Sequence, residues 1–171
     1  MNGLEIRSAE AVELDEIVGA LVQPAYFADR LDRQRTRLGL LLVAWLDRRP
    51  VGDVYLWCEP AFEEIVVRHL PGVPLLTHLE VLPNHRNRGI GTQLVVHAET
   101  HLRDRGFTRV ALSVGEENKN ARRLYERLGY VEWDHGCLTT ISEVFGPDGT
   151  VRKVADATKS RLMVKQLAQT P

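Results

Sequence analysis

The sequence predicts an α/β fold with a mixed β-sheet at its centre. Short apolar runs of strand length alternate along the chain with segments whose apolar residues recur every three or four positions, as on one face of a helix. Two of these helical segments stop at Gly106 and Gly129, and glycine is common just beyond the end of a helix. The predicted order is β-α-α-β-β-β-α-β-α-β with further strands behind, which favours helices packed against a mixed sheet.

The N-terminal segment is predicted to contain one strand and two helices. Residues Leu4–Arg7 read as the strand, and Ser8 is expected to cap the helix that follows. That helix is expected to end at Pro24, because proline interrupts a helix interior. A second, exposed helix is expected over Tyr26–Leu38, where arginines and aspartates surround a few apolar residues.

The middle of the chain is predicted to form a β-hairpin followed by a longer strand. Residues 40–46 and 51–57 have the length and composition of strands and flank the turn residues 47–50. Residues 59–72 are expected to be an irregular or partly helical insert. The strand 75–82 follows this insert and leads into the most informative part of the sequence.

The C-terminal half is predicted to contain two helices, over 90–102 and 118–128, and several strands. The turn residues Gly146-Pro147-Asp148-Gly149 indicate a hairpin, because proline followed by Asp-Gly suits a tight turn. The strands expected in this half are 109–114, 130–133, 138–145, 150–154 and 161–167.

Composition indicates one soluble domain over residues 1–171. Hydrophobic residues make up 44% and charged residues 26% of the chain, and the net charge of −1 gives no basic field for nucleic acid or an anionic membrane. No apolar run has the length of a membrane span, and the N-terminus lacks the regions of a signal peptide. Cys58 and Cys137 have no metal-like spacing, so we expect reduced thiols, no metal and a cytoplasmic location.

The junction between strand 75–82 and the next helix indicates a site for a phosphate group. The strand runs into a basic turn with the pattern R-x-x-G-x-G, at Arg86, Gly89 and Gly91, and the turn opens directly into a helix. The first amides of a helix have no partners within the helix and lie at the positive end of its dipole. A turn with little side-chain bulk lets a pyrophosphate approach them, although an ordinary strand-turn-helix connection would have the same composition.

A second motif identifies the family that the chain resembles. Residues Asn118–Tyr130 read N-K-N-A-R-R-L-Y-E-R-L-G-Y and match the pattern N-x-x-A-x-x-L-Y-x-x-x-G-[FY]. Together with R-x-x-G-x-G one helix and one strand earlier, this pattern resembles the GNAT superfamily of N-acetyltransferases. The resemblance covers residues 4–133 and the closing strand 161–167. It implies a GNAT-like fold with a central mixed sheet splayed in the middle, about four flanking helices and, here, an additional C-terminal β-hairpin.

The resemblance implies acetyl-CoA as co-substrate and assigns residues to it. The backbone of the strand end would pair with the pantetheine arm, and the amides of the turn would bind the pyrophosphate. Asn118 matches a position that contacts the pantetheine, and it is equally suited to cap the helix that it begins. The predicted cofactor-binding residues are Val81, Leu82, Pro83, Arg86, Arg88, Gly89, Ile90, Gly91, Thr92 and Asn118.

The resemblance also implies three catalytic candidates. Tyr125 matches the position that protonates the departing thiolate, and a buried packing tyrosine is the alternative. Glu80 and His78 alternate with apolar residues, so both are expected on one face of their strand, where either would take a proton from the attacking amine. A salt-bridged Glu80 and a structural His78 are the alternatives.

The acceptor is predicted to be a primary amine of a small molecule, attacked directly in a ternary complex. Two alternatives stay open, namely acetylation of protein N-termini or lysines, and a non-catalytic acyl-CoA-binding module. The hairpin 137–154 is expected to shape the acceptor site or to form a homodimer contact through its edge. Nucleic acid and membranes are not expected partners.

Overall fold

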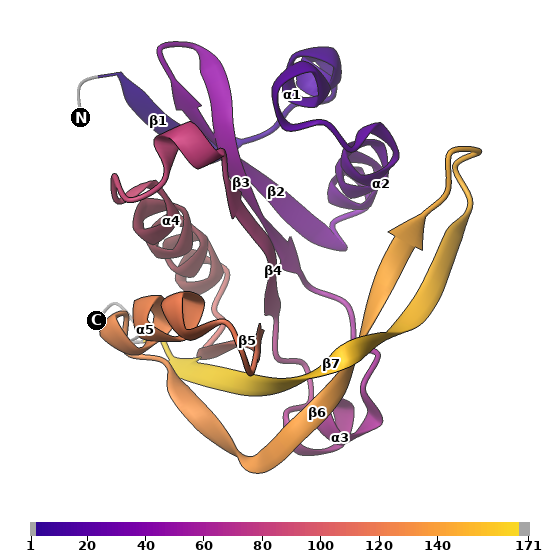
Figure 1. The fold of residues 1–171 in the computed structure, drawn as a ribbon, viewed down its shortest axis with the longest axis vertical. Helices are drawn as coiled ribbons and strands as arrows, with labels where there is room; N and C mark the ends of the chain where they lie inside the picture. The colour runs from indigo at the N-terminus through magenta and orange to yellow at the C-terminus, as the bar shows by residue number, and fades with distance from the viewer. Residues whose placement is uncertain (1–2, 168–171) are drawn as a thin grey trace. The chain divides into compact units, whose positions relative to one another are not determined.

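The structure is a computed structural model, and it describes residues 3–167. Figure 1 shows a mixed α/β fold with the elements in the predicted order. The strands are β1 (Leu4–Ser8), β2 (Gly39–Leu46), β3 (Arg49–Trp57), β4 (Leu75–Val81), β5 (Arg109–Gly115), β6 (Val131–Phe145) and β7 (Val151–Gln166). The helices are α1 (Leu14–Leu21), α2 (Pro24–Arg35), α3 (Glu64–His69), α4 (Ile90–Asp104) and α5 (Lys119–Arg127), with 3-10 turns η1 (Ala11–Glu13) and η2 (Pro83–His85).

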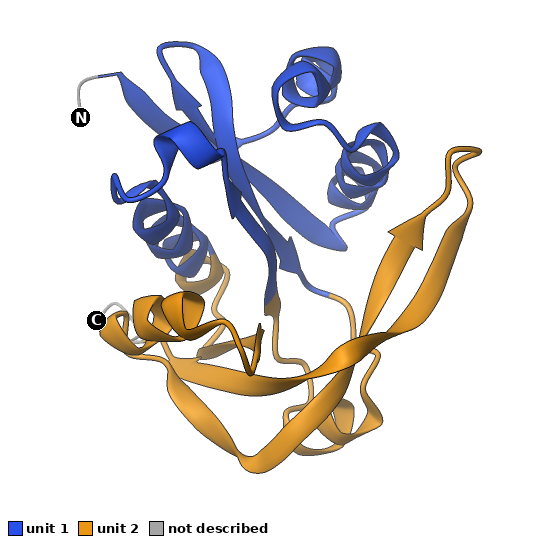
Figure 2. Ribbon diagram, viewed as in Figure 1, with its two compact units in different colours: residues 1–58, 76–101 blue, residues 59–75, 102–171 orange. Residues whose placement is uncertain are grey.

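The strands form a seven-stranded sheet in the order β1-β2-β3-β4-β5-β7-β6. Pairs β1–β2, β2–β3, β5–β7 and β6–β7 are antiparallel, whereas β4 and β5 are parallel with Leu75 opposite Ala111. The predicted mixed sheet and C-terminal hairpin are confirmed. The chain divides into two compact units, residues 1–58 with 76–101 and residues 59–75 with 102–171 (Figure 2).

Unit 1 is built on strands that are apolar on both faces. β2 is buried along its length except at Leu46, which explains why its sequence is a continuous apolar run rather than an alternating one. Helices α1 and α2 cover one face of the unit's strands, and α4 covers the other (Figure 1). The largest fully buried side chains of this core are Tyr55, Phe27, Ile17, Leu41, Leu56, Ile90 and Leu94.

A glycine lets β3 and β4 approach each other closely. A Cβ atom added at Gly52 of β3 would lie 2.6 Å from the carbonyl oxygen of Glu80 and 3.2 Å from the Cα of Val81. The neighbouring strand connection is also tight, because the Leu82 N–H donates to the Val51 carbonyl over 2.9 Å. Gly52 thus fixes the spacing at the part of β4 that leads into the predicted site.

Three local predictions for unit 1 are wrong. Ser8 does not cap a helix: it is the last residue of β1, and the turn η1 begins later, where the Glu13 side chain accepts from the Glu10 N–H over 2.8 Å. Pro24 does not end α1 but begins α2 at its first turn, where a missing N–H costs nothing. The second helix is not simply exposed, because it buries Tyr26, Phe27, Leu31 and even the charged Arg30.

Unit 2 contains the C-terminal hairpin and its own apolar core. β7 pairs with β5 from Ser160 to Gln166 and with β6 between Val151 and Val164, where the register shifts twice. The insert between β3 and β4 contributes α3. One buried cluster of this core consists of Val66, Leu70, Val73, Ala111, Leu138 and Leu162.

The sequence predicted more and shorter strands in unit 2 than the structure contains. Apart from Tyr130, segments 130–133 and 138–145 are parts of the single strand β6, and apart from Thr150 and Leu167, segments 150–154 and 161–167 are parts of β7. The pairing of β6 with β7 shifts register between Glu132 and Cys137, where Gly136 has a φ of +74°. An irregularity of this kind bends a strand without ending its ladder, so polar residues at the bend resemble a loop in the sequence.

Among residues 3–167, no helix is both long enough and apolar enough to cross a membrane.

Candidate functional site

The connection between β4 and α4 presents unpaired backbone amides. Two residues of the turn have left-handed backbone, Asn87 with a φ of +59° and Gly89 with a φ of +78°. The first bond of α4 joins the Gln93 N–H to the Gly89 carbonyl over 3.0 Å. The N–H groups of Ile90, Gly91 and Thr92 therefore precede the helical ladder and have no acceptor within the helix. A 15-residue helix adds the positive end of its dipole at this point.

Gly89 keeps the approach to these amides open. A Cβ atom built on Gly89 would meet no atom within 4 Å, so the space above the turn is empty. The left-handed φ nevertheless disfavours any side chain at this position. An open glycine turn before a long helix fits a pyrophosphate group, whereas a bulky side chain would fill the space that the group needs.

The end of β4 is held in place by its own turn. Arg86 donates from Nε to the Val81 carbonyl over 2.8 Å, and the Leu82 carbonyl accepts from the His85 N–H over 2.8 Å. Two backbone groups of the predicted pantetheine-binding residues, the Val81 carbonyl and the Leu82 N–H, thus have partners within the chain. A carbonyl oxygen has a second lone pair, so Val81 retains one acceptor position.

His78 interrupts the alternation of β4. Its φ of +53° is left-handed, and left-handed backbone is uncommon for a residue other than glycine. The Nδ1 atom of His78 lies 2.9 Å from Asp53 Oδ2, and its Nε2 atom lies 3.3 Å from Gln23 Oε1 and 3.7 Å from Glu80 Oε1. His78 and Glu80 lie close together, but their environments differ. The Glu80 side chain is 59% exposed, whereas that of His78 is 18% exposed.

The environment of His78 is aromatic on one face and anionic at one edge. Its ring stacks on Tyr26, with centroids 4.1 Å apart and an angle of 26° between the planes. The Asp53 carboxylate raises the pKa of His78 above its ordinary value, although burial alone would lower that pKa. Burial has the opposite effect on Asp53: it raises the pKa of the carboxyl group, while the hydrogen bond and positive charge of His78 lower it. Each partner therefore stabilises the charged form of the other, Asp53 as the carboxylate and His78 as the imidazolium.

The sequence did not indicate Asp53, Tyr26 or Gln23 as parts of this cluster. Asp53 is a lone acid inside the apolar segment Val51–Trp57, and it is 1% exposed in the structure. Because isolated charges are rarely buried without a partner, this lone acid was the signal that could have revealed the pair. Tyr26 and Gln23 belong to the region that was interpreted as an exposed helix and its approach.

Arg30 is the buried cation beside this cluster. It is 6% exposed and pairs with Asp29 over 2.9 Å. Its guanidinium carbon lies 4.8 Å from the ring centroid of Tyr26, 4.9 Å from that of Tyr55 and 5.3 Å from that of Trp57. Cation–π contacts and the Asp29 carboxylate help to compensate its burial, and Arg30 packs against Tyr26, on which His78 stacks.

Tyr125 and Asn118 belong to unit 2. Tyr125 is buried, its ring contacts Tyr130 edge-on at a centroid distance of 5.6 Å, and burial raises its pKa to about 12. Asn118 begins α5, and its Oδ1 accepts from the Ala121 N–H over 3.1 Å. The predicted capping role of Asn118 is confirmed, whereas its contact with a cofactor and the catalytic role of Tyr125 remain predictions.

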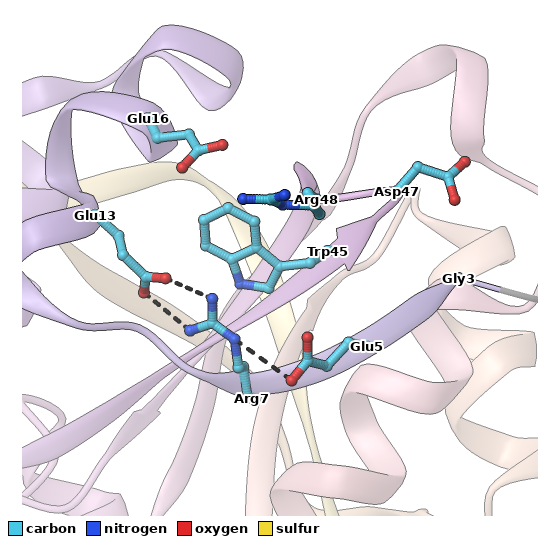
Figure 3. A pocket seen from close by; sticks show the side chains of 8 residues that line it. All are labelled: Gly3, Glu5, Arg7, Glu13, Glu16, Trp45, Asp47 and Arg48. Atoms are coloured by element: carbon cyan, nitrogen blue, oxygen red, sulfur yellow. Dashed lines mark hydrogen bonds and ion pairs between the residues drawn. The ribbon is translucent and has the colours of Figure 1, made fainter.

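A surface pocket elsewhere in unit 1 contains none of the predicted site residues. It has a volume of about 660 Å³ and lies at β1 and the turn between β2 and β3 (Figure 3). Arg7 forms an ion pair with Glu13 and lies 4.7 Å from the ring centroid of Trp45. These contacts connect β1 to η1 and β2, so we interpret the residues that line the pocket as stabilising the fold rather than binding a ligand.

Comparison with known proteins identifies the family. Residues 9–130 match the sequence model of the acetyltransferase (GNAT) family. This range includes both motifs and covers well over half of the chain. The chain therefore belongs to the GNAT acetyltransferase family, and its resemblance to that family is confirmed.

The curated relatives match over shorter segments. The mycothiol acetyltransferase of Streptosporangium roseum is 44% identical over 52 residues, which are 30% of this chain and 15% of that protein. The mycothiol acetyltransferase of Thermobifida fusca is 33% identical over 88 residues, which are 52% of this chain and 20% of that protein. The chain thus spans a fifth or less of the length of these two relatives.

Solved structures match the fold over nearly the whole chain. The ribosomal-protein-S18-alanine N-acetyltransferase of Escherichia coli has a TM-score of 0.67 at 18% identity, covering 98% of this chain and 96% of that one. The PaiA N-acetyltransferase of Thermoplasma acidophilum, solved in complex with coenzyme A, has a TM-score of 0.68 at 16% identity, covering 95% and 98%. At these identities the likeness demonstrates the GNAT fold alone.

Proposed function

We propose that the chain is an N-acetyltransferase that transfers the acetyl group of acetyl-CoA directly to a primary amine of a small molecule. The observation that carries this proposal is the open glycine turn before α4. It combines a left-handed Gly89, empty space above it and unpaired amides from Ile90 to Thr92. Because the chain belongs to the GNAT family, the pyrophosphate expected at this turn is that of acetyl-CoA.

In this proposal the turn and the end of β4 hold the co-substrate. The amides from Arg88 to Thr92 bind the pyrophosphate, and Arg88, which is exposed, adds positive charge. Arg86 acts mainly on the protein itself, because its Nε bonds the Val81 carbonyl and fixes the end of β4. Pro83, Leu82 and the remaining acceptor position of Val81 line the path of the pantetheine arm.

The reaction would be a direct acyl transfer. The nitrogen of the neutral amine forms a bond to the acetyl carbonyl carbon, the bond between that carbon and sulfur breaks, and the CoA thiolate leaves. The amine arrives mostly as ammonium and gives up two protons on its way to the amide, so a base on β4 must accept a proton. Glu80 and His78 are the candidates, and Tyr125 is the candidate donor to the thiolate.

The small-molecule acceptor is supported by the mycothiol acetyltransferases among the relatives, and a protein acceptor by the E. coli ribosomal-protein acetyltransferase among the similar structures. We prefer the first, because those relatives are more than 30% identical to this chain over the matched segments. The homodimer through the hairpin and the cytoplasmic location remain expectations.

A thermal melt with and without acetyl-CoA tests the co-substrate. Ligand at about 100 times its Kd adds roughly 2.7 kcal/mol, which raises the melting temperature of a domain of this size by about 5–11 °C. ATP and NAD serve as controls for other pyrophosphates. A shift with all three ligands, or with none, contradicts the proposed co-substrate.

Turnover distinguishes an enzyme from a non-catalytic acyl-CoA-binding module. Release of free CoA thiol is followed with a panel of small primary amines, peptides with free N-termini and lysine peptides. Turnover with a small amine and none with peptides supports the proposal. Acetyl-CoA binding without turnover on any class favours the binding module.

A further inference from the structure

We propose that Asp53 is a positioning residue that fixes the tautomer of His78, so that His78 Nε2 is the atom that takes the proton from the acceptor amine. This inference rests on the proposed acetyl transfer and deepens it, because it chooses between the two candidate bases on β4 and names a residue that acts through one of them.

The tautomer follows from the hydrogen bond at Nδ1. Asp53 Oδ2 lies 2.9 Å from His78 Nδ1, and an ionised carboxylate can only accept. Nδ1 must therefore keep its proton. In the neutral imidazole the lone pair is then at Nε2, which makes Nε2 the basic atom.

The cluster around Nε2 suits a bound ammonium group. Gln23 Oε1 at 3.3 Å and Glu80 Oε1 at 3.7 Å flank His78 Nε2, so three acceptors converge when His78 is neutral. When His78 is protonated, Gln23 Oε1 accepts from its Nε2–H, and the Glu80 carboxylate at 3.7 Å forms an ion pair with the imidazolium. The cluster can thus hold a proton either on the incoming amine or on the imidazole, which is what a proton acceptor requires.

Backbone strain is concentrated at the same place. His78 and Gln23, which contact each other through their side chains, have φ values of +53° and +56°. Val22, the residue before Gln23, has a φ of +63°, which is rare for a β-branched side chain. Left-handed backbone at two residues that meet is costly and accumulates at functional sites.

Glu80 is the weaker base candidate for a physical reason. Its side chain is 59% exposed, so water rather than the protein solvates its charge and little in the fold holds it toward the amine. His78 is half-buried, and it contacts the Asp53 carboxylate, which is 1% exposed and raises the pKa of His78 above its ordinary value. The groups that act on its charge are Asp53, Glu80, the cation Arg30 and the stacked, buried Tyr26, whose own pKa burial raises well above its ordinary value.

The tautomer can be measured on the unmodified protein by 15N NMR of its histidine rings. The His78 signals are assigned as those absent from His78→Gln. We expect a titration midpoint above the ordinary histidine value of about 6.5, and above that midpoint a proton on Nδ1 and none on Nε2. A neutral His78 with its proton on Nε2 overturns the proposal, and this measurement needs neither ligand nor turnover.

Asp53→Asn tests the functional part. The variant should lower the His78 midpoint, because burial then acts without the carboxylate, and should move the acid limb of the kcat/KM profile to lower pH by the same amount. We expect kcat to fall by roughly 10²–10⁴-fold, the range that general base catalysis contributes. The acetyl-CoA-induced shift in the thermal melt should persist, which checks folding and separates binding from proton transfer.

Glu80→Gln is the matched control, since it removes a carboxylate near the same Nε2 atom without touching Nδ1. It should leave the tautomer of His78 unchanged. If Asp53→Asn keeps the wild-type kcat and pH profile while the unmodified chain is active, the positioning role of Asp53 is refuted and the proposed acetyl transfer stands. If the unmodified chain neither binds acetyl-CoA nor transfers acetyl groups, the proposed function fails, and this inference with it.

Discussion

Gly89→Ala tests the turn between β4 and α4 because it separates the binding of acetyl-CoA from folding. The added Cβ atom would meet no protein atom within 4 Å, so the only cost to the free protein is the left-handed φ of +78°. That conformation costs a residue other than glycine about 1–2 kcal/mol. The melting temperature should fall by about 2–8 °C.

Gly72→Ala is the matched control for this strain. Gly72 has a φ of +67°, and a Cβ atom there would also meet nothing within 4 Å, but it lies in the insert before β4 and outside the turn. Both variants should lose similar stability. Only Gly89→Ala should lose affinity for acetyl-CoA, by at least tenfold or about 1.4 kcal/mol, because the methyl group occupies the space that the pyrophosphate needs.

The assay is a titration of acetyl-CoA into each variant by calorimetry at a temperature where all three proteins are folded. Melts without ligand provide the stability comparison. If both alanine variants bind acetyl-CoA as tightly as the unmodified chain, the turn is not the pyrophosphate site. If both lose affinity equally, strain rather than position explains the loss, and the reasoning is refuted as well.

Three further outcomes are expected. Tyr125→Phe should keep acetyl-CoA affinity and lower kcat at least tenfold. Because burial raises the pKa of Tyr125 to about 12, the kcat of the unmodified chain should show no decline from ionisation of Tyr125 up to pH 10. A Phe variant with full kcat excludes Tyr125 as the proton donor to the thiolate. Glu13→Gln should lower the melting temperature by about 1–4 °C at pH 7, because Arg7 lowers the pKa of Glu13. This difference in melting temperature from the unmodified chain should be complete above the unfolded pKa of about 4.3 and vanish as pH falls through the folded pKa. A difference that persists at pH 2 contradicts the ion pair. Gly52→Ala should cost about 1–3 kcal/mol because its Cβ would lie 2.6 Å from the Glu80 carbonyl oxygen, and an unchanged urea midpoint would show that β3 and β4 separate freely.

The sequence predicted the order of elements and the turn at Gly89 because both depend on local signals. A continuous apolar run such as β2 can only be a buried strand or helix, and its length decides between them. The R-x-x-G-x-G turn needs glycine at the position where φ is positive, so the residue type at position 89 indicates the turn directly from the sequence.

The cluster around His78 was only partly predictable because its members are distant in sequence. The left-handed backbone at His78 is not marked by a glycine, so the sequence does not reveal it. From the sequence alone, β4 therefore reads as a regular alternating strand. The pairing with Asp53 spans 25 positions and depends on the register of β3 against β4. Only the presence of an acid inside an apolar strand pointed to it, since a buried carboxylate needs a partner.

β7 is one strand with two kinds of neighbour, and this gives its amides two expected lifetimes. Residues from Ser160 to Val164 lie between β5 and β6, whereas Val151–Ala155 pair with β6 alone, where the hairpin extends (Figure 1). Hydrogen exchange depends on the free energy of the smallest opening that frees an amide. The distal half can separate without disturbing the buried core, so its amides should exchange by local opening. The half beside β5 should exchange only when unit 2 unfolds, and a single strand would then report two different stabilities.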